Sequence, residues 1–310
     1  MRPIRDALLV LSRSGAVKGL VSTLPISSSI VRSYVPGETV REAIAVVESL
    51  AAEGIDTTVD HLGEETLDEA QATAAVQAYR VLLDRIADAR LGGRAEVSVK
   101  LTAIGLRLPD GERIALENAR RICRAAAGAG TTVTIDMEDH TTTDATLAIV
   151  RALREDFPAT GAVLQAHLRR TEADCRELAA AGSRVRLCKG AYDEPAEVAF
   201  TDPGDVDRSY VRCLKVLFAG EGYPMVATHD PRLVELASAL ASRYGRAPGT
   251  YEFQMLYGVR PAEQRRLAAS GERVRVYLPY GEEWYGYLVR RLAERPRNLS
   301  LFLTSLVSKK

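Results

Sequence analysis

The chain has 310 residues, longer than a usual single domain but within the range of an α/β barrel, a fold that needs about 250 residues. Hydrophobic residues make up 46% of the chain, enough for a large core. Its 41 basic and 41 acidic residues cancel, so no overall field attracts nucleic acid or anionic lipid. We therefore expect one large domain that binds a small partner and no nucleic acid.

The cysteines and the N-terminus indicate an intracellular protein. The four cysteines form no C-x-x-C pair, and we expect them to be reduced packing residues. Residues 1–31 have only short apolar runs broken by Arg, Ser, Gly and Pro, with no signal peptide and no run of about 18 apolar residues. We expect a cytoplasmic protein that is neither exported nor spans a membrane.

In chain order, the first 56 residues predict a helical extension, because 36–54 has a Pro-Gly start, a helical apolar stripe and a terminal glycine. From residue 57 onward, short β-rich runs alternate with longer helical patterns, as in repeated βαβ units around a parallel sheet. The predicted strands are 57–63, 96–105, 132–139, 162–168, 184–192, 225–230, 251–257 and 273–281.

Eight such units predict an α/β fold of the (β/α)8 TIM-barrel type over 57–310, preceded by the 1–56 extension within a single domain. The rival is a doubly wound open sheet. That fold would usually carry G-x-G-x-x-G after an early strand, and the sequence has no such motif there. The barrel is therefore the favoured fold.

Polar side chains gather where the predicted strands end, which in a barrel is the face that carries the active site. They come from five strands: Lys100; Asp136 and Glu138; Gln165 and His167; Arg186 and Lys189; Thr228 and His229. Any single one could be a paired charge that fills the barrel interior. A set that converges from five strands instead favours a ligand site.

The last predicted helix, "EEWYGYLVRRLAERP", follows the eighth strand and should lie over the barrel mouth. Spacings of three and four place Tyr287, Arg290, Arg291 and Glu294 along one side. Arg290 and Arg291 can both bind one anion if the helix lies across it, and Glu294 could orient either guanidinium. An ordinary surface helix rich in Arg and Glu is the alternative, and the aromatic residues at Tyr277, Tyr280 and Tyr287 weigh against it.

Three other interpretations stay open on the residues alone. The four histidines fall at or just after strands, but no H-x-H or H-E-x-x-H pair occurs, and we predict no metal. Lys100 or Lys189 could form a Schiff base, as in barrel aldolases and lyases, if desolvation lowered its pKa. A non-catalytic barrel that binds an amino acid or a partner is the third.

Seven strings occur in the order seen in proline dehydrogenases: "VSVKLTAIG", "TIDMED", "VLQAHLRRTEAD", "VRLCKGAY", "VATHD", "EFQMLYG" and "VYLPYG...YLVRRL". Each lies at a predicted strand end or in the last helix. The chain resembles that family from about residue 20 to residue 300. The resemblance implies FAD over the barrel mouth, oxidation of L-proline to 1-pyrroline-5-carboxylate by hydride transfer to the flavin N5, and electron transfer to a quinone.

The same motifs imply site residues. For the cofactor, the resemblance places Arg186 beside the flavin N5, Gln165 and Asp136 at the flavin, Lys189, Gly190 and Tyr192 near the phosphates and ring, and Thr228 and His229 on the adenosine side. For the substrate, it implies Lys100 and Asp136 beneath the ring, Tyr277, Leu256 and Tyr287 around it, and Arg290 and Arg291, oriented by Glu294, on the carboxylate. Arg186, Lys100 and Asp136 would be the catalytic residues.

The chain is similar to the short monofunctional branch of the family, since "GAYDEP" has no Trp after Tyr192 and the spacing from Tyr277 to Tyr287 is short. We expect no aldehyde dehydrogenase half and no DNA-binding segment, so a separate pyrroline-5-carboxylate dehydrogenase should act downstream. The tail 298–310 is apolar with a basic end. It implies at most peripheral contact with the inner face of a membrane.

Overall fold

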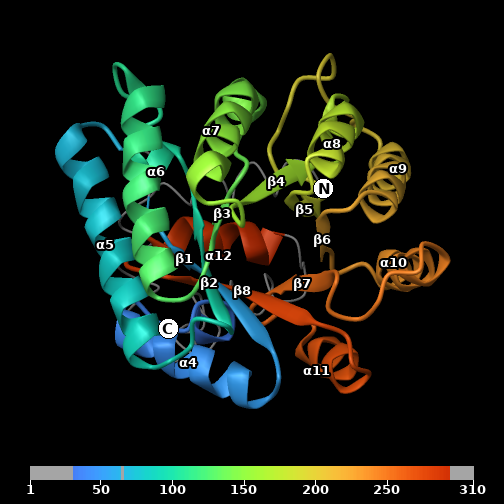
Figure 1. Ribbon diagram of the computed structural model, residues 1–310, viewed down its shortest axis with the longest axis horizontal. Helices are drawn as coiled ribbons and strands as arrows, with labels where there is room; N and C mark the ends of the chain where they lie inside the picture. Colours follow the sequence, from blue (N-terminus) through green and yellow to red (C-terminus); the bar gives the residue numbers. More distant parts are fainter. Residues whose placement is uncertain (1–30, 64–65, 294–310) are drawn as a thin grey trace, which may run out of the picture.

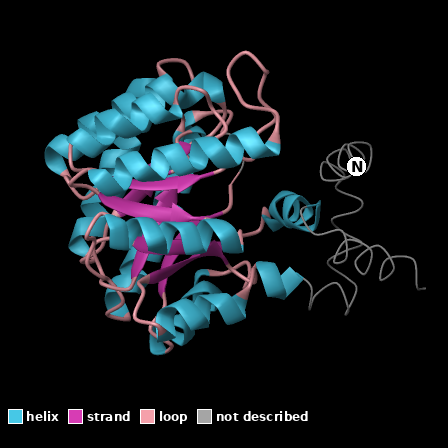
Figure 2. Cartoon of the chain, turned by 90° about the vertical axis from the view of Figure 1, so that its right-hand side faces the viewer, coloured by secondary structure: helices cyan, strands magenta, loops and turns pink. Residues whose placement is uncertain are grey.

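A computed structural model describes residues 31–63 and 66–293, and the side chains of the last helix through Leu288. Eight parallel strands close into one barrel in sequence order, with β8 paired to β1 (Figures 1 and 2). The strands are β1 (Asp56–His61), β2 (Ala95–Val99), β3 (Val133–Ile135), β4 (Gly161–Gln165), β5 (Arg184–Cys188), β6 (Tyr223–Ala227), β7 (Glu252–Leu256) and β8 (Val274–Tyr280). The predicted (β/α)8 barrel is confirmed.

Helices surround the barrel, and α4 (Val40–Ala52) precedes the first strand. Between strands lie α5 (Glu69–Asp88), α6 (Gly111–Gly128), α7 (Thr143–Asp156), α8 (Thr171–Ala180), α9 (Pro203–Ala219), α10 (Pro231–Arg243) and α11 (Pro261–Ala269), with short 3₁₀ helices η1 (Thr102–Ile104) and η2 (His140–Thr142). The last helix, α12 (Trp284–Ala293), lies across the barrel in the view of Figure 1. Residues 1–30 of the predicted extension lie outside the described residues, and its boundary at residue 56 stays a prediction.

Local sequence accounts for where these elements begin. Thr39 caps α4 in a capping box with Glu42, so the backbone N–H groups of both residues have side-chain acceptors. The side chain of Asp68 caps α5, and proline in the first turn starts α9, α10 and α11. In β4, Gly161 faces the interior, where a Cβ would lie 2.7 Å from Thr134 Oγ1. A larger residue there would displace its neighbour.

Apolar packing occurs in two separate clusters. The main core lies between the sheet and the surrounding helices. A second cluster joins the N-terminal segment to α12 and consists of Tyr34, Val35, Leu62, Val259, Trp284, Tyr285, Tyr287 and Leu288. Trp284 Nε1 also donates to Glu38 Oε1 at 2.6 Å, and Gly258, with φ +72°, allows the backbone of Ser33 to approach closely. The N-terminal segment is therefore packed against the helix at the barrel mouth.

The predicted strand ends were wrong at several places. The second strand ends at Val99 rather than at residue 105, because 102–104 form η1, which Gly105 ends with φ +106°. The third ends at Ile135 rather than at 139, and Asp136 is already beyond it. A strand ends where its parallel partner no longer offers hydrogen bonds, and polar residues just past that point belong to the loops that form the site.

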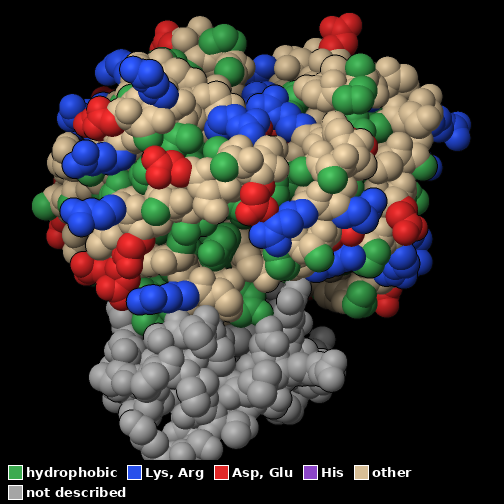
Figure 3. All heavy atoms as spheres, turned by 90° about the horizontal axis from the view of Figure 1, so that it is seen from below, with side chains coloured by type: hydrophobic (Ala, Val, Ile, Leu, Met, Phe, Trp, Pro, Cys, Tyr) green, Lys and Arg blue, Asp and Glu red, His purple; other side chains and the backbone are tan. Residues whose placement is uncertain are grey.

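The molecular surface has no single-sign field on the face shown in Figure 3, where Lys and Arg side chains are mixed with Asp and Glu. This agrees with the balanced charge of the whole sequence. Within residues 31–63 and 66–293, no helix is long and apolar enough to cross a bilayer. The tail 298–310, for which peripheral membrane contact was predicted, lies outside the described residues.

Candidate active site

A cavity of about 520 Å³ opens at the carboxyl ends of the strands. Every strand, or the loop directly after it, contributes to its lining, and α12 adds Tyr287. The lining includes Asp60, Lys100, Asp136, Gln165, Arg186, Lys189, Gly190, Tyr192, Thr228, His229, Gln254, Leu256, Tyr277 and Tyr287. Its volume is within the range of a small-molecule site, and apolar and cationic groups share its walls.

Arg186 forms part of the cavity wall and is only 4% exposed. Its Nη1 donates to Asp136 Oδ1 at 2.7 Å and to Ser98 Oγ at 3.0 Å, and its Nε donates to Gln254 Oε1 at 2.6 Å. The guanidinium carbon lies 5.3 Å from the centre of the Tyr277 ring. Acceptors on two sides of the guanidinium thus fix a buried cation at the base of the cavity.

Asp136 connects this cation to the opposite wall. Its Oδ1 accepts from both Arg186 and Ser98, and its Oδ2 accepts from the Tyr277 hydroxyl at 2.8 Å. Burial, together with Asp136, raises the pKa of Tyr277 well above its ordinary value, so the phenol stays protonated as the donor. With these bonds in place, Asp136 acts as an acceptor that joins β8 to β5.

Lys100 follows β2 and pairs with Asp60 Oδ2 at 2.6 Å, with Asp136 Oδ2 at 3.9 Å. Burial alone would lower the pKa of Lys100, but the charges of Asp60 and Asp136 outweigh it and raise the pKa above the ordinary value. A Schiff-base lysine needs a neutral amine. The surroundings of Lys100 therefore disfavour this lysine as the one that forms a Schiff base.

The other end of the cavity lies over the N-terminus of α10. Lys189 pairs with Asp207 Oδ1 at 2.5 Å and with Asp230 Oδ2 at 3.4 Å. Asp230 caps α10, and its pKa is lowered to about 2, chiefly by the hydrogen bond from Arg232 and further by Lys189. A lysine beside a helix N-terminus is suited to bind an anionic group.

His229 is fixed by the strand next to it, since its Nε2 accepts from the Leu256 backbone N–H at 2.8 Å. That acceptor role defines the neutral tautomer, with the proton on Nδ1. Gln165, in β4, donates from Nε2 to the Glu138 carbonyl at 2.7 Å. Both side chains are thus held in single orientations at the edge of the cavity.

Residues 189–192, at the start of the loop 189–202, line one side of the cavity, and glycine is required there. Gly190 has φ +103°, and a Cβ there would lie 1.9 Å from Nδ1 of His167. Farther along, Glu194 accepts from the His140 backbone N–H at 2.9 Å and contacts its ring. Two contacts of different kinds thus position the loop over the neighbouring strands.

The predicted residues do not all reach the cavity. Glu138 accepts from the Thr102 backbone N–H at 3.1 Å and from its hydroxyl, and burial raises the pKa of Glu138 above its ordinary value. His167 packs against Gly190. Neither residue is part of the cavity lining. The side chains of Arg290 and Arg291, and all of Glu294, lie outside the described residues.

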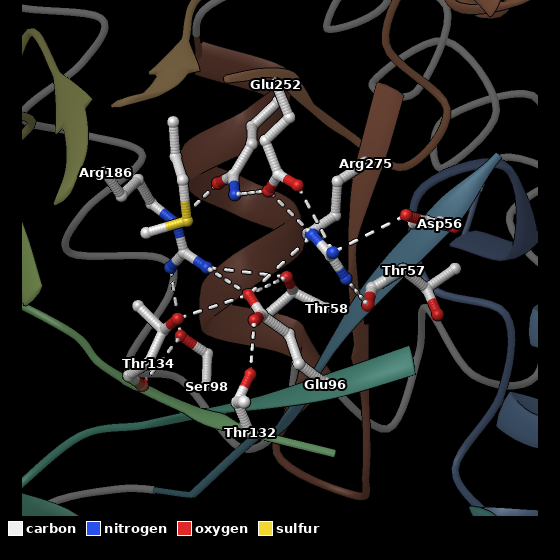
Figure 4. Close-up of polar contacts among 12 residues, drawn as sticks. Asp56, Thr57, Thr58, Glu96, Ser98, Thr132, Thr134, Arg186, Glu252 and Arg275 are labelled. Carbon is white, nitrogen blue, oxygen red and sulfur yellow. Dashed lines mark hydrogen bonds and ion pairs between the residues drawn. The ribbon is translucent and has the colours of Figure 1, made fainter. Parts of the chain in front are cut away.

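Beneath Arg186, charged groups fill a barrel interior that aliphatic residues usually occupy. We call Glu96, Glu252, Gln254 and Arg275 the interior network. Figure 4 shows Arg186 and Arg275 beside Glu96 and Glu252, with the threonines of neighbouring strands around them. Arg275 donates to Glu252 at 2.7 and 3.2 Å, and Glu96 pairs with Arg184 at 2.7 Å.

Sequence reasoning missed Asp60, Ser98 and the interior network. One signal was available, because the period of two along a strand puts residues 252, 254 and 256 on one side, and residues 275 and 277 likewise. A polar residue at an inward position of a barrel must have a partner there. Among the described residues, no group of three or more His, Cys, Asp or Glu is arranged to hold a metal ion.

Comparison with known proteins identifies the family of this chain. The family model described as proline dehydrogenase matches residues 43–302. The chain belongs to the proline dehydrogenase family. Proline dehydrogenase 1 of Bacillus subtilis is 38% identical over 278 residues, covering 90% of this chain and 91% of the relative. Proline dehydrogenase of Deinococcus radiodurans is 39% identical, covering 90% of each chain. The expectation of an enzyme of the proline dehydrogenase family is confirmed.

A solved structure supports the fold. Proline utilization A from Bdellovibrio bacteriovorus, inactivated by N-propargylglycine, superposes with a TM-score of 0.80 at 27% identity. The match covers 86% of this chain and 33% of that one, so this chain spans about a third of that protein. The likeness therefore concerns the barrel of this chain and not the rest of that protein.

Proposed function

We propose that the chain catalyses FAD-dependent oxidation of L-proline to 1-pyrroline-5-carboxylate and that the electrons pass to a quinone. Membership of the proline dehydrogenase family and the names of the similar proteins support proline as the substrate. When bound, FAD would supply the hydride acceptor, N5, for the carbon next to the proline nitrogen. Proline gives up one hydride and one proton, which balances the formation of the ring C=N bond.

The residues of the cavity fit a flavin nucleotide. A flavin needs apolar walls for its ring, hydrogen-bond partners for its polar edge and cations for its phosphates. Met137, Val163 and Leu256 supply apolar wall, and Gln165 lies at the edge. Lys189 and the N-terminus of α10 would face the phosphates, with Thr228 and His229 toward the adenosine.

The observation that carries the proposal is the fixed guanidinium of Arg186. A buried cation at a cavity wall stabilises negative charge that develops beside it, and it needs no reorganisation when its orientation is already set. Arg186 meets that condition, because Asp136, Ser98 and Gln254 accept its hydrogen bonds. Its role is to stabilise the charge that arrives with the hydride.

The other polar groups position rather than transfer protons. Asp136 accepts hydrogen bonds from three side chains, and Lys100 is held protonated by Asp60, so neither is suited as a general base. Catalysis then depends on placing the donor carbon, with Tyr277, Leu256 and Tyr287 as walls around the substrate ring. Arg290 and Arg291, oriented by Glu294, are proposed to hold the carboxylate.

The test separates the two proposed arginine roles. Arg291→Met should retain flavin and raise KM for proline about tenfold to a hundredfold, since a charge-assisted hydrogen bond contributes about 1.5–3 kcal/mol. Arg186→Met should slow flavin reduction more than it weakens proline binding. Arg151→Met, an exposed arginine of α7, is the matched control. Loss of flavin from Arg291→Met, or an unchanged reduction rate in Arg186→Met, would contradict these assignments.

The proposed reaction also has partners beyond the site. The quinone would be reached by a peripheral encounter of a cytoplasmic protein with the membrane, and a separate pyrroline-5-carboxylate dehydrogenase would consume the product. Both are inferred from membership of the proline dehydrogenase family. The encounter with a quinone is tested by sedimenting the protein with vesicles that contain a quinone and with vesicles that lack one. Quinone reductase activity should be recovered with the first kind of vesicle.

A further inference from the structure

Gln254 links Arg186, the proposed catalytic cation, to the charged members of the interior network. It lies in β7, is 4% exposed, and its amide bridges two charged side chains. Its Oε1 accepts from Arg186 Nε at 2.6 Å, and its Nε2 donates to Glu252 Oε1 at 2.6 Å. Gln254 also lines the cavity.

The two partners fix the direction of the amide. A guanidinium only donates hydrogen bonds, and an ionised carboxylate only accepts them. The amide oxygen must therefore face Arg186 and the amide nitrogen must face Glu252. The reversed amide would bring two donors together on one side and two acceptors together on the other, with both charges buried.

Glu252 is itself held in place. Arg275 donates to both of its oxygens, and the Tyr223 hydroxyl donates to Oε2 at 3.0 Å. Burial alone would raise the pKa of Glu252, but the charge of Arg275 and the hydrogen bonds from Arg275 and Gln254 together lower the pKa below its ordinary value. Glu252 is thus an ionised acceptor with a fixed orientation, and it imposes that orientation on the glutamine.

The hydrogen bond from Arg186 Nε to Gln254 is important because the other short hydrogen bonds of Arg186 all come from one nitrogen. Asp136 and Ser98 both accept from the same terminal nitrogen, Nη1, while Thr58 and Glu96 are farther from Nη2, at 3.5 and 3.6 Å. Gln254 provides the short contact at a different edge of the planar guanidinium, at Nε. Without it, the plane can pivot about Nη1, and electrostatic stabilisation depends on the direction of the donor.

We propose that Gln254 is a positioning residue that fixes the plane of the Arg186 guanidinium, and that Glu252 fixes the Gln254 amide in turn. The inference rests on the proposed function for the role of Arg186 toward bound flavin. The contact between Gln254 and Arg186 does not depend on that role. The two statements can therefore fail separately.

The first experiment measures the midpoint potential of the bound flavin in wild type, Gln254→Met, Arg186→Met and the double variant. Gln254→Met should lower the potential, with the reduced flavin stabilised about tenfold less relative to the oxidised form, which is about 30 mV for a two-electron couple. In the Arg186→Met background, Gln254→Met should cause no further shift. The milder Gln254→Asn, whose amide cannot span both partners, should shift the potential in the same direction by less.

Gln264→Met is the matched control. Gln264 is also 4% exposed, but its amide donates to the carbonyls of Leu256 and Val259 and does not contact Arg186. It should lose stability and keep the wild-type potential. The proposal is overturned if Gln254→Met and Gln254→Asn keep the wild-type potential, or if their shifts persist unchanged without Arg186.

A second experiment uses the flavin-free proteins. A double-mutant cycle on the free energy of unfolding should show coupling between Gln254 and Arg186 and additivity between Gln264 and Arg186. Additive effects for the first pair would overturn the contact. Reduction of the wild-type flavin by proline reports on the proposed function alone, so flavin that proline leaves oxidised would reject that function and leave the potentials as the test of Gln254.

Discussion

Asp230 connects a helix terminus to the cavity through one carboxylate. It caps α10, accepts from Arg232 and pairs with Lys189. Its pKa is lowered to about 2 from an ordinary value of about 3.9. A depressed carboxyl contributes stability above its unfolded pKa and loses that contribution as the pH falls through its folded pKa.

Asp230→Asn should therefore destabilise the protein at pH 7 by about 1 kcal/mol, because asparagine can still cap the helix but carries no charge. The pKa shift of Asp230 alone would correspond to a larger loss of stability, but Arg232 is exposed and solvent screens its charge. Urea unfolding of both proteins at several pH values measures the difference, which should shrink as the pH falls from about 4 to about 2. A difference that is constant over that range would show that the charge contributes nothing.

At the scale of elements, loop 189–202 depends on one glycine. Gly190→Ala should place a methyl group against the His167 ring in a backbone conformation that L-residues rarely adopt, so the loop must move. We expect a loss of more than about 2 kcal/mol in the free energy of unfolding and weaker flavin binding. Gly182→Ala is the control, since φ there is +64° but nothing lies within 4 Å of its Cβ. Equal losses in the two variants would mean that the His167 contact is unimportant.

Helix α12 is held by the N-terminal segment through Trp284, which is buried and donates to Glu38. Trp284→Phe removes the donor but retains an aromatic ring. Because the proposed carboxylate-binding arginines lie farther along this helix, KM for proline should rise about threefold to tenfold, the equivalent of one hydrogen bond, while flavin content stays unchanged. Glu38→Gln should do less, and Glu48→Gln, on an exposed position of α4, should do nothing. An unchanged KM in Trp284→Phe would show that this contact does not set the position of α12.

The number, order and type of the strands could be predicted from sequence, because β-rich runs and helical patterns alternate regularly. Their ends could not be placed well. Thr102 and Glu138 are in predicted strands, but Thr102 begins η1, Glu138 lies in the loop after β3, and the two residues hydrogen-bond to each other. That contact is between residues 36 positions apart, and no local pattern reports it.

For the whole molecule, the barrel divides its stability and its proposed chemistry between two layers. The apolar core lies outside the sheet, and the interior holds paired charges such as Arg275 with Glu252 and Arg184 with Glu96. A buried pair of this kind destabilises strongly when one partner is lost, by about 3–5 kcal/mol. The charged side chains of the interior therefore keep their positions only when every partner is present. Arg186 depends on the same contacts, because Gln254 connects it to Glu252.

The candidate site could be predicted in part for the same reason. Lys100, Asp136 and Arg186 were expected from their residue types at strand ends and from the family motifs. Gln254 and Asp60 were not expected, because the role of each depends on the charged side chain that it contacts from another strand of the barrel. The register between strands that are distant in sequence determines these contacts. The roles of Arg290, Arg291 and Glu294 stay predictions.

The central claim is that this barrel binds FAD and transfers hydride to it from proline. Anaerobic titration of the purified, flavin-loaded protein with L-proline, without any electron acceptor, tests it most directly. We expect the visible absorbance of the oxidised flavin to be lost as proline is added, 1-pyrroline-5-carboxylate to form in equal amount, and a quinone to restore the absorbance. Flavin that stays oxidised in excess proline would contradict it.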